Sequence, residues 1–197
     1  MIDKIWSFPQ YFLIIRCNRV YMDMSRFLTI FGLIFFGIAT RVMPHPPCFT
    51  PLNAIILFSV YHYQNRSLTL FLLFSTLLFS DLVIGFYSTL PFVYFSFCLV
   101  IFIGQKLKEK MPLRYLFFIS LLTSFLFFLI TNFGVWTMGS LYPKTLAGLS
   151  TCYLAGIPFL RNQILGDLSY SFLLFGYVAY WKKNFSSQYA LRNFQPN

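Results

Sequence analysis

Long apolar runs separated by short polar connections make up most of the chain. The runs cover residues 27–43, 51–63, 68–87, 89–105, 115–137 and 162–181. A helix needs about 20 mostly apolar residues to cross a bilayer. The pattern therefore predicts an all-α integral membrane bundle of six transmembrane helices.

A further short apolar run lies at 146–160. A seventh span there would move the lysines at 182 and 183 to the outer side, so we expect a re-entrant or outer-side helix. Pro158 is expected to bend or end it. Small residues recur every four positions, which favours packing inside the bundle or docking of a partner subunit. They form two ridges, Ala147, Thr151 and Ala155 beside Gly148, Cys152 and Gly156.

Composition supports a membrane protein with no separate soluble domain. Hydrophobic residues make up 58% of the 197 positions and charged residues only 10%, whereas a soluble domain carries about 25% charged residues. We expect a cytoplasmic or interfacial N-terminal segment at 1–26, the transmembrane domain at 27–181 and a cytoplasmic tail at 182–197. The lipid bilayer is thus the first expected partner.

The basic residues set the expected orientation. With both termini cytoplasmic, only Arg41, Lys144 and Arg161 fall on the outer side. The other twelve of the fifteen then lie inside, as the positive-inside rule requires: Lys4, Arg16, Arg19, Arg26, Arg66, Lys106, Lys108, Lys110, Arg114, Lys182, Lys183 and Arg192. The net charge of +10 is therefore a topology signal, and we expect no nucleic-acid partner.

Motifs for catalysis, metal binding and cofactor binding are missing from the sequence. The four cysteines are scattered, with no C-x-x-C pair, so no metal site is expected. The sequences around Asp81 and Asp167 differ from the Tyr-Asp and Gly-x-Gly-Asp patterns of intramembrane aspartyl proteases, and "GLSTC" differs from G-x-S-x-G. No phosphate-binding loop occurs either. We therefore expect neither an enzyme nor a bound cofactor.

Polar side chains inside the predicted spans point to a site. Asp81 lies about 20 Å from the inner end of its span and Asp167 about 8 Å below the outer end of its own, at about 1.5 Å per residue. In a hydrocarbon core about 30 Å thick these depths match. Asn132 and Trp136 fall in the outer half of a third span. Carboxylates at such depth usually face a cavity or a partner.

The outer connections complete this expected site. The segment "RVMPHPPCFTPLN" carries four prolines, which lack backbone donors and can enter a membrane face with few unsatisfied amides. We expect it to fold over the bundle and close a polar pocket for a small-molecule solute. The candidate substrate-binding residues are Arg41, His45, Asn53, Asp81, Asn132, Trp136, Tyr142, Lys144, Arg161 and Asp167.

Three other interpretations of these residues remain open. Asp81 could pair with Arg41 or His45, and Asp167 with Arg161, as purely structural ion pairs. An ion- or proton-coupled secondary carrier could use Asp81 and Asp167 as relay groups. A non-transport membrane assembly protein would need no ligand at all.

Several segments also resemble a known group of sequences. "RVMPHPPCFTPLNAIILFS", "SDLVIGF", "FFLITNFGVW" and "YPKTLAGLSTCYLAGIPF" resemble a family of small bacterial membrane proteins described only as transport proteins. That family is similar to the substrate-binding S components of energy-coupling factor vitamin transporters. Cys48 stands where the family's stretch is expected to have asparagine, and the first span lacks the A-x-x-x-A docking pattern of many S components.

The resemblance implies a function and a location. It implies a multi-pass protein of the bacterial cytoplasmic (inner) membrane that captures a vitamin or similar small solute from outside. It also implies a separate transmembrane coupling subunit with ATPases as partner.

Overall fold

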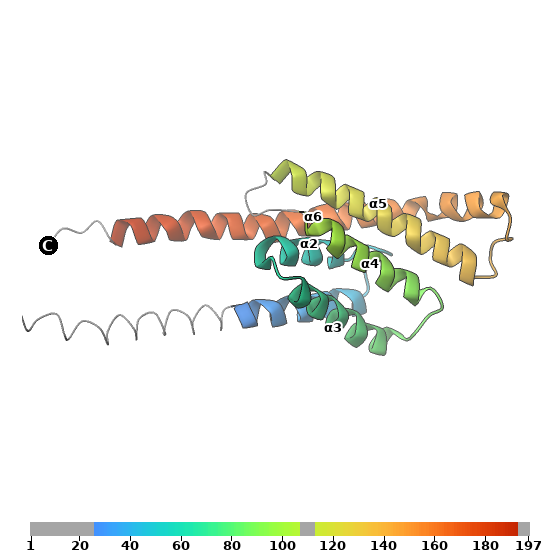
Figure 1. The fold of residues 1–197 in the computed structure, drawn as a ribbon, viewed down its shortest axis with the longest axis horizontal. Helices are drawn as coiled ribbons and strands as arrows, with labels where there is room; N and C mark the ends of the chain where they lie inside the picture. Colours follow the sequence, from blue (N-terminus) through green and yellow to red (C-terminus); the bar gives the residue numbers. More distant parts are fainter. Residues whose placement is uncertain (1–25, 107–112, 193–197) are drawn as a thin grey trace, which may run out of the picture.

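Six helices and no strand are formed by the residues that the computed structural model describes, 26–106 and 113–192. The first helix covers 26–42 and is followed by α2 (Leu52–Tyr63), α3 (Arg66–Ile84), α4 (Leu90–Gly104), α5 (Leu113–Met138) and α6 (Leu146–Arg192). Successive helices run in opposite directions along the long axis (Figure 1). The connections 43–51, 85–89 and 139–145 therefore share one end of the bundle.

The predicted all-α class is confirmed, but the expected separate helix at 146–160 is wrong. Residues 146–160 and 162–181 belong to one continuous helix, α6, which passes through Pro158. Proline removes one backbone hydrogen bond, and neighbouring helices can compensate for that loss in an apolar bundle. Here α5 lies along the segment before Pro158, where the Tyr153 hydroxyl donates to the Leu129 carbonyl at 2.8 Å.

The two ridges of small residues have different neighbours. Cys152 and Gly156 are buried against α5, where a Cβ at Gly156 would lie 2.5 Å from Asn132 Oδ1. In the other ridge Ala147, Thr151 and Ala155 are exposed. The ridge of Gly148, Cys152 and Gly156 thus serves close packing inside the bundle, which was one of the two expectations for this segment.

Helix α2 is the centre of the bundle although it has only 12 residues. It packs against α3, α4, α5 and α6, and every residue from Leu52 to Val60 is buried. At about 1.5 Å per residue it is roughly 18 Å long, so it cannot extend the full length of the neighbouring helices. The connection 43–51 therefore continues into the bundle to reach the start of α2 (Figure 1).

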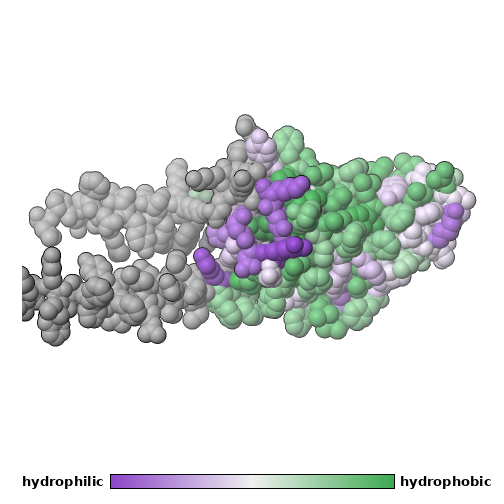
Figure 2. Space-filling model, in the orientation of Figure 1, coloured by the Kyte–Doolittle hydropathy of each residue, from purple (hydrophilic) through white to green (hydrophobic). Residues whose placement is uncertain are grey.

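The surface of the described residues is mainly apolar. Large hydrophobic side chains are exposed on the first helix and on α3 to α6, and they include Phe35, Phe71, Phe118 and Phe172. Figure 2 shows this apolar surface, with hydrophilic side chains gathered beside the grey residues and at the opposite tip. Among the described helices, α3 and the Tyr115–Met138 part of α5 are long and apolar enough to cross a membrane.

Some predicted segments fall partly outside the described residues. Of the expected N-terminal segment 1–26, only position 26 is described, as the first residue of a helix. The expected tail at 182–197 starts within α6, which continues without a break to Arg192.

Candidate functional site

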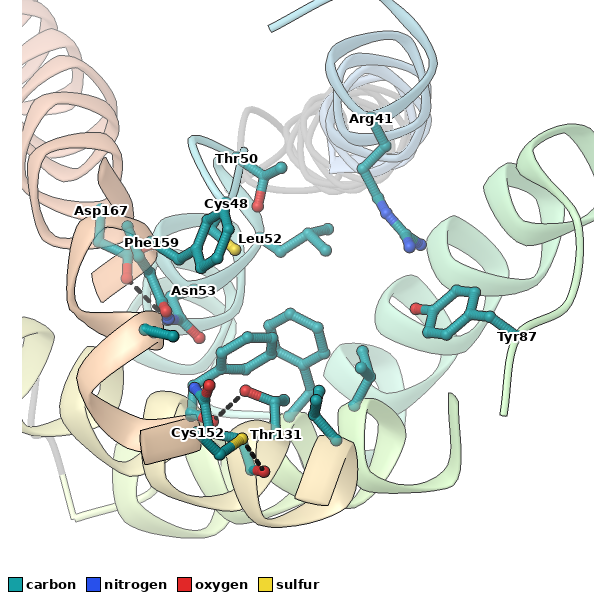
Figure 3. A pocket seen from close by; sticks show the side chains of 18 of the residues that line it. Arg41, Cys48, Thr50, Leu52, Asn53, Tyr87, Thr131, Cys152, Phe159 and Asp167 are labelled. Carbon is teal, nitrogen blue, oxygen red and sulfur yellow. Dashed lines mark hydrogen bonds between the residues drawn. The ribbon is translucent and has the colours of Figure 1, made fainter. Parts of the chain in front are cut away.

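A cavity of about 580 Å³ lies at the end of the bundle that carries the connections 43–51, 85–89 and 139–145. All three connections contribute to its wall, and α2 contributes its first turn. The cavity is lined mostly by apolar side chains, and Figure 3 shows it from close by. Its aromatic lining residues are Tyr87, Phe97, Phe127, Tyr142 and Phe159.

One side of the cavity holds a buried hydrogen-bond network between α2, α5 and α6. Asn53 Nδ2 donates to Asp167 Oδ2 at 2.7 Å, and Ser124 Oγ donates to the same oxygen at 2.5 Å. The side chain of Gln163, one turn earlier on α6, also interacts with this carboxylate. Asn53 is 2% exposed and Asp167 1% exposed, so neither group is solvated like a surface side chain.

One acceptor in this network has no partner. Asn53 Oδ1 is buried and receives no hydrogen bond from the described residues. The orientation of the amide follows from the contact with Asp167, because a carboxylate oxygen accepts and the Nδ2 group must face it. The carbonyl oxygen of Asn53, a cavity-lining residue, therefore has unfilled acceptor capacity.

Arg41 lies on the opposite side of the cavity (Figure 3), with the carboxylate of Asp81 behind it. Arg41 Nη2 lies 2.8 Å from Asp81 Oδ1, and Arg41 Nη1 donates to Ser80 Oγ at 2.6 Å. The Tyr94 hydroxyl donates to Asp81 Oδ2 at 2.9 Å. The positive charge that faces the cavity at Arg41 is thus offset by a fully buried carboxylate.

Tyr87 stands beside this pair in the connection between α3 and α4. Partial burial raises the pKa of its phenol, and the nearby Arg41 guanidinium opposes that rise. Tyr87 therefore stays neutral at physiological pH and offers the cavity a hydroxyl group on an aromatic ring.

The connection 43–51 is held on α6. The Asn162 Nδ2 group donates to the Pro47 carbonyl at 3.3 Å, and the Phe49 ring lies 5.5 Å from that of Tyr170. A Cβ at Gly166 would come within 3.3 Å of the Phe49 Cα, so the loop backbone rests directly on the helix. The prolines of this loop remove donors that would otherwise need partners in this position.

Hydrogen bonds to the end of α5 hold the connection 139–145 in place. Lys144 Nζ donates to the carbonyls of Trp136, Thr137 and Gly139 at the end of α5. The ammonium group also lies 5.6 Å from the Trp136 ring, whose Nε1 donates to Pro143 O at 3.0 Å. A cation at a helix C-terminus is favourable because it offsets the unpaired carbonyls.

The cavity brings together six of the ten residues proposed from sequence. Arg41, His45, Asn53, Asn132, Tyr142 and Asp167 line it.

The other four lie outside the lining. Asp81 is buried behind Arg41, while Trp136 and Lys144 stabilise the 139–145 connection. Arg161 is exposed. The expected pairing of Asp81 with Arg41 is present, whereas Asp167 has Asn53 and Ser124 as partners in place of Arg161.

Several polar groups at the cavity or beside Asp167 were not expected from the sequence. Ser124 was hidden in the α5 run "ISLLTSF", although Ser120 and Ser124, four residues apart in an apolar stretch, share one helix face. Gln163 lies four residues before Asp167, which again places both side chains on one face. Thr50 and Cys48 line the cavity only because the loop enters the bundle, which no local pattern indicates.

Comparisons with known proteins give one match. Residues 22–189 match the model of a family described as a family of unknown function (DUF6580). No curated protein and no solved structure matches the chain.

Proposed function

Since the chain belongs to DUF6580, whose function is unknown, we propose from its site that it captures a small solute at a membrane. The solute binds in the 580 Å³ cavity and is taken up by the cell. In this role the chain resembles the S components of vitamin transporters. The proposed location is the bacterial inner membrane, with several spans and both termini in the cytoplasm.

The apolar surface supports the membrane location. Exposed phenylalanines on the first helix, α3, α5 and α6 would be unfavourable in water, because large contiguous apolar patches are rare on soluble monomers. The distribution of basic residues supports the orientation, in which the cavity opens toward the outer side.

The cavity is the observation that carries the proposal. Ligand sites commonly have volumes of about 300–1,000 Å³, mostly apolar walls and a few placed polar groups, and this cavity has all three features. The loop 43–51 forms part of its wall and rests on α6, where Asn162 donates to the Pro47 carbonyl and Phe49 packs against Tyr170. We propose that this loop is the lid through which the solute enters.

The energy for uptake would come from another protein. The chain has no G-x-x-x-x-G-K-[ST] loop for binding ATP phosphates. A transmembrane coupling subunit with ATPases is therefore the proposed partner.

Two neighbouring residues on α6 allow a matched test of the cavity. Ala155 lines the cavity, whereas the preceding Leu154 is 66% exposed and lies outside its lining. Ala155→Phe adds a ring in the cavity, and Leu154→Phe places the same side chain on the surface. Each protein is purified in mild detergent, and small molecules released on denaturation are quantified by mass spectrometry.

We expect the wild type and Leu154→Phe to carry the same compound, near one per chain, and Ala155→Phe to carry at least about tenfold less. Circular dichroism confirms that all three proteins are folded. Equal loading of Ala155→Phe, or no compound on the folded wild type, would contradict the proposal.

A further inference from the structure

The polar groups that line the cavity also define the chemistry of its ligand. This inference rests on the proposed function, because it concerns the occupant of the same cavity. Arg41 and Asp167 line the cavity, and so does His45. Which of these side chains can bind a ligand depends on the protein groups with which each already pairs.

Arg41 is not a free anion site. Its guanidinium is engaged by the Asp81 carboxylate and by the Ser80 hydroxyl, at 2.8 and 2.6 Å. Because Asp81 is fully buried, its charge is not screened by water and offsets that of Arg41 at close range. His45 Nδ1 lies 2.7 Å from the Met43 carbonyl oxygen, which only accepts, so this ring nitrogen donates to the backbone.

Asp167 differs because only neutral groups surround its carboxylate. Asn53 and Ser124 donate to it, and among the described residues it forms no salt bridge. Asn53 Oδ1 adds a second acceptor beside it, buried and without a partner. This side of the cavity therefore lacks a positive charge and offers unfilled acceptor capacity, at groups that are 2% exposed or less.

The remaining wall suits a flat apolar body. Phe97, Phe127 and Phe159 line the cavity, and each presents a ring that can stack on or contact an aromatic ligand. Such rings also attract a cation through their negative faces. A carboxylate or phosphate in the same place would face the acceptor oxygens of Asn53 and Asp167, and the donors of Asn53 and Ser124 are already engaged, so its own oxygens would lack partners.

We propose that the ligand is an aromatic nitrogen compound that donates N–H groups, neutral or cationic, to Asn53 Oδ1 and Asp167. The described residues form no cationic rim that would favour an anionic ligand, since Arg41 is paired with Asp81, Lys144 caps α5 and Arg161 is exposed outside the lining.

Three probes of similar size and different charge test the proposal. Tryptamine is a cation, indole-3-propionamide is neutral, and indole-3-propionate is an anion, and all share the indole ring. Their affinities for the full chain in detergent, freed of co-purified compound, are measured by thermal unfolding over a concentration series.

We expect tryptamine to bind about tenfold or more tighter than indole-3-propionate, with the amide between them. Asp167→Asn keeps the shape of the side chain and should remove most of this preference. If that variant does not fold, the order of the three probe affinities for the wild type tests the inference alone. Equal or tighter binding of the anion, abolished by Ala155→Phe, would overturn this inference while leaving solute capture intact.

The chemical identity of the compound that co-purifies is a second test of the inferred ligand class. An aromatic compound with N–H donors supports the inference, and a compound without donors overturns it. No binding of any probe together with no co-purified compound would contradict the proposed function as well.

Discussion

Asn53 Nδ2 donates to Asp167 Oδ2 at 2.7 Å and so joins the first turn of α2 to the middle of α6, 114 residues further along the chain. Both side chains are buried, and Ser124 of α5 donates to the same oxygen. One carboxylate thus connects three helices at the wall of the cavity. The contact joins the start of α2 to α6, while Asn53 Oδ1 receives no hydrogen bond from the described residues.

The first prediction concerns this contact. Asn53→Ala and Asp167→Ala each leave buried partners unsatisfied and should lower the free energy of unfolding by about 1–3 kcal/mol. The double variant should lose less than the sum of the two, with a coupling of about 0.5–3 kcal/mol. Denaturation in mixed micelles measures all three. Ser150→Ala, at an exposed position of α6, is the control and should change little. Strict additivity would show that the two side chains do not interact.

The second prediction concerns Arg41 and Asp81. Either Arg41→Met or Asp81→Leu leaves one buried charge unpaired and should destabilise the protein by about 3–5 kcal/mol. The double variant replaces the pair by apolar groups and should be more stable than either single variant. Arg161→Met removes an exposed charge and should have almost no effect. If Arg41→Met were as mild as Arg161→Met, the pair would not be buried as described.

Close packing of the first helix gives the third prediction. A Cβ at Gly37 would lie 2.6 Å from Thr76 Cγ2 on α3, and Thr76 is held by a hydrogen bond to Leu72 O. A Cβ at Gly32 meets nothing within 4 Å. Gly37→Val should therefore lower the free energy of unfolding by about 1–3 kcal/mol, whereas Gly32→Val should be nearly neutral. Equal melting temperatures for the two variants would contradict this packing.

The fourth prediction concerns the backbone at Cys48, which has φ of 64°. This left-handed conformation is strained for most side chains and is tolerated best by glycine and asparagine. Cys48→Asn should therefore stabilise the protein by about 0.5–1 kcal/mol, measured as a higher melting temperature. Cys48→Ala removes the thiol without relieving the strain and is the control. A lower melting temperature for Cys48→Asn than for Cys48→Ala would contradict this explanation.

The same φ value explains an expectation from the sequence. The resemblance led us to expect asparagine at position 48, where this chain has cysteine. A left-handed backbone in a proline-rich loop accounts for asparagine there without any ligand.

Apolar periodicity was enough to place most helices. The ends of the first helix and of α2 to α5 agree with the predicted runs within three residues. Local composition determines these segments, since each is apolar and bounded by glycine, proline or polar residues. Pro158 does not end the helix as expected: it lies at an exposed position of α6, where it removes one backbone hydrogen bond and the helix continues.

The site was only partly predictable, because the sequence does not give the direction of a side chain or the fold of a loop. Asn132 and Asp167 were proposed because polar groups in apolar runs are conspicuous, and Asn53 was proposed because it ends the proline-rich outer segment. Depth along a span does not tell which way a side chain faces, so Asp81 was included although it is buried behind Arg41. The contact of Lys144 with the end of α5 depends on the fold of the loop 139–145, which has no signature in the sequence.

Native mass spectrometry of the full chain, released from detergent micelles, tests the central claim most directly. We predict that the wild type and Leu154→Phe carry an added mass corresponding to one small molecule per chain, and that Ala155→Phe carries none. A folded wild type with no added mass, or with the same mass on Ala155→Phe, would contradict solute capture in this cavity and favour a coupled carrier or an assembly role.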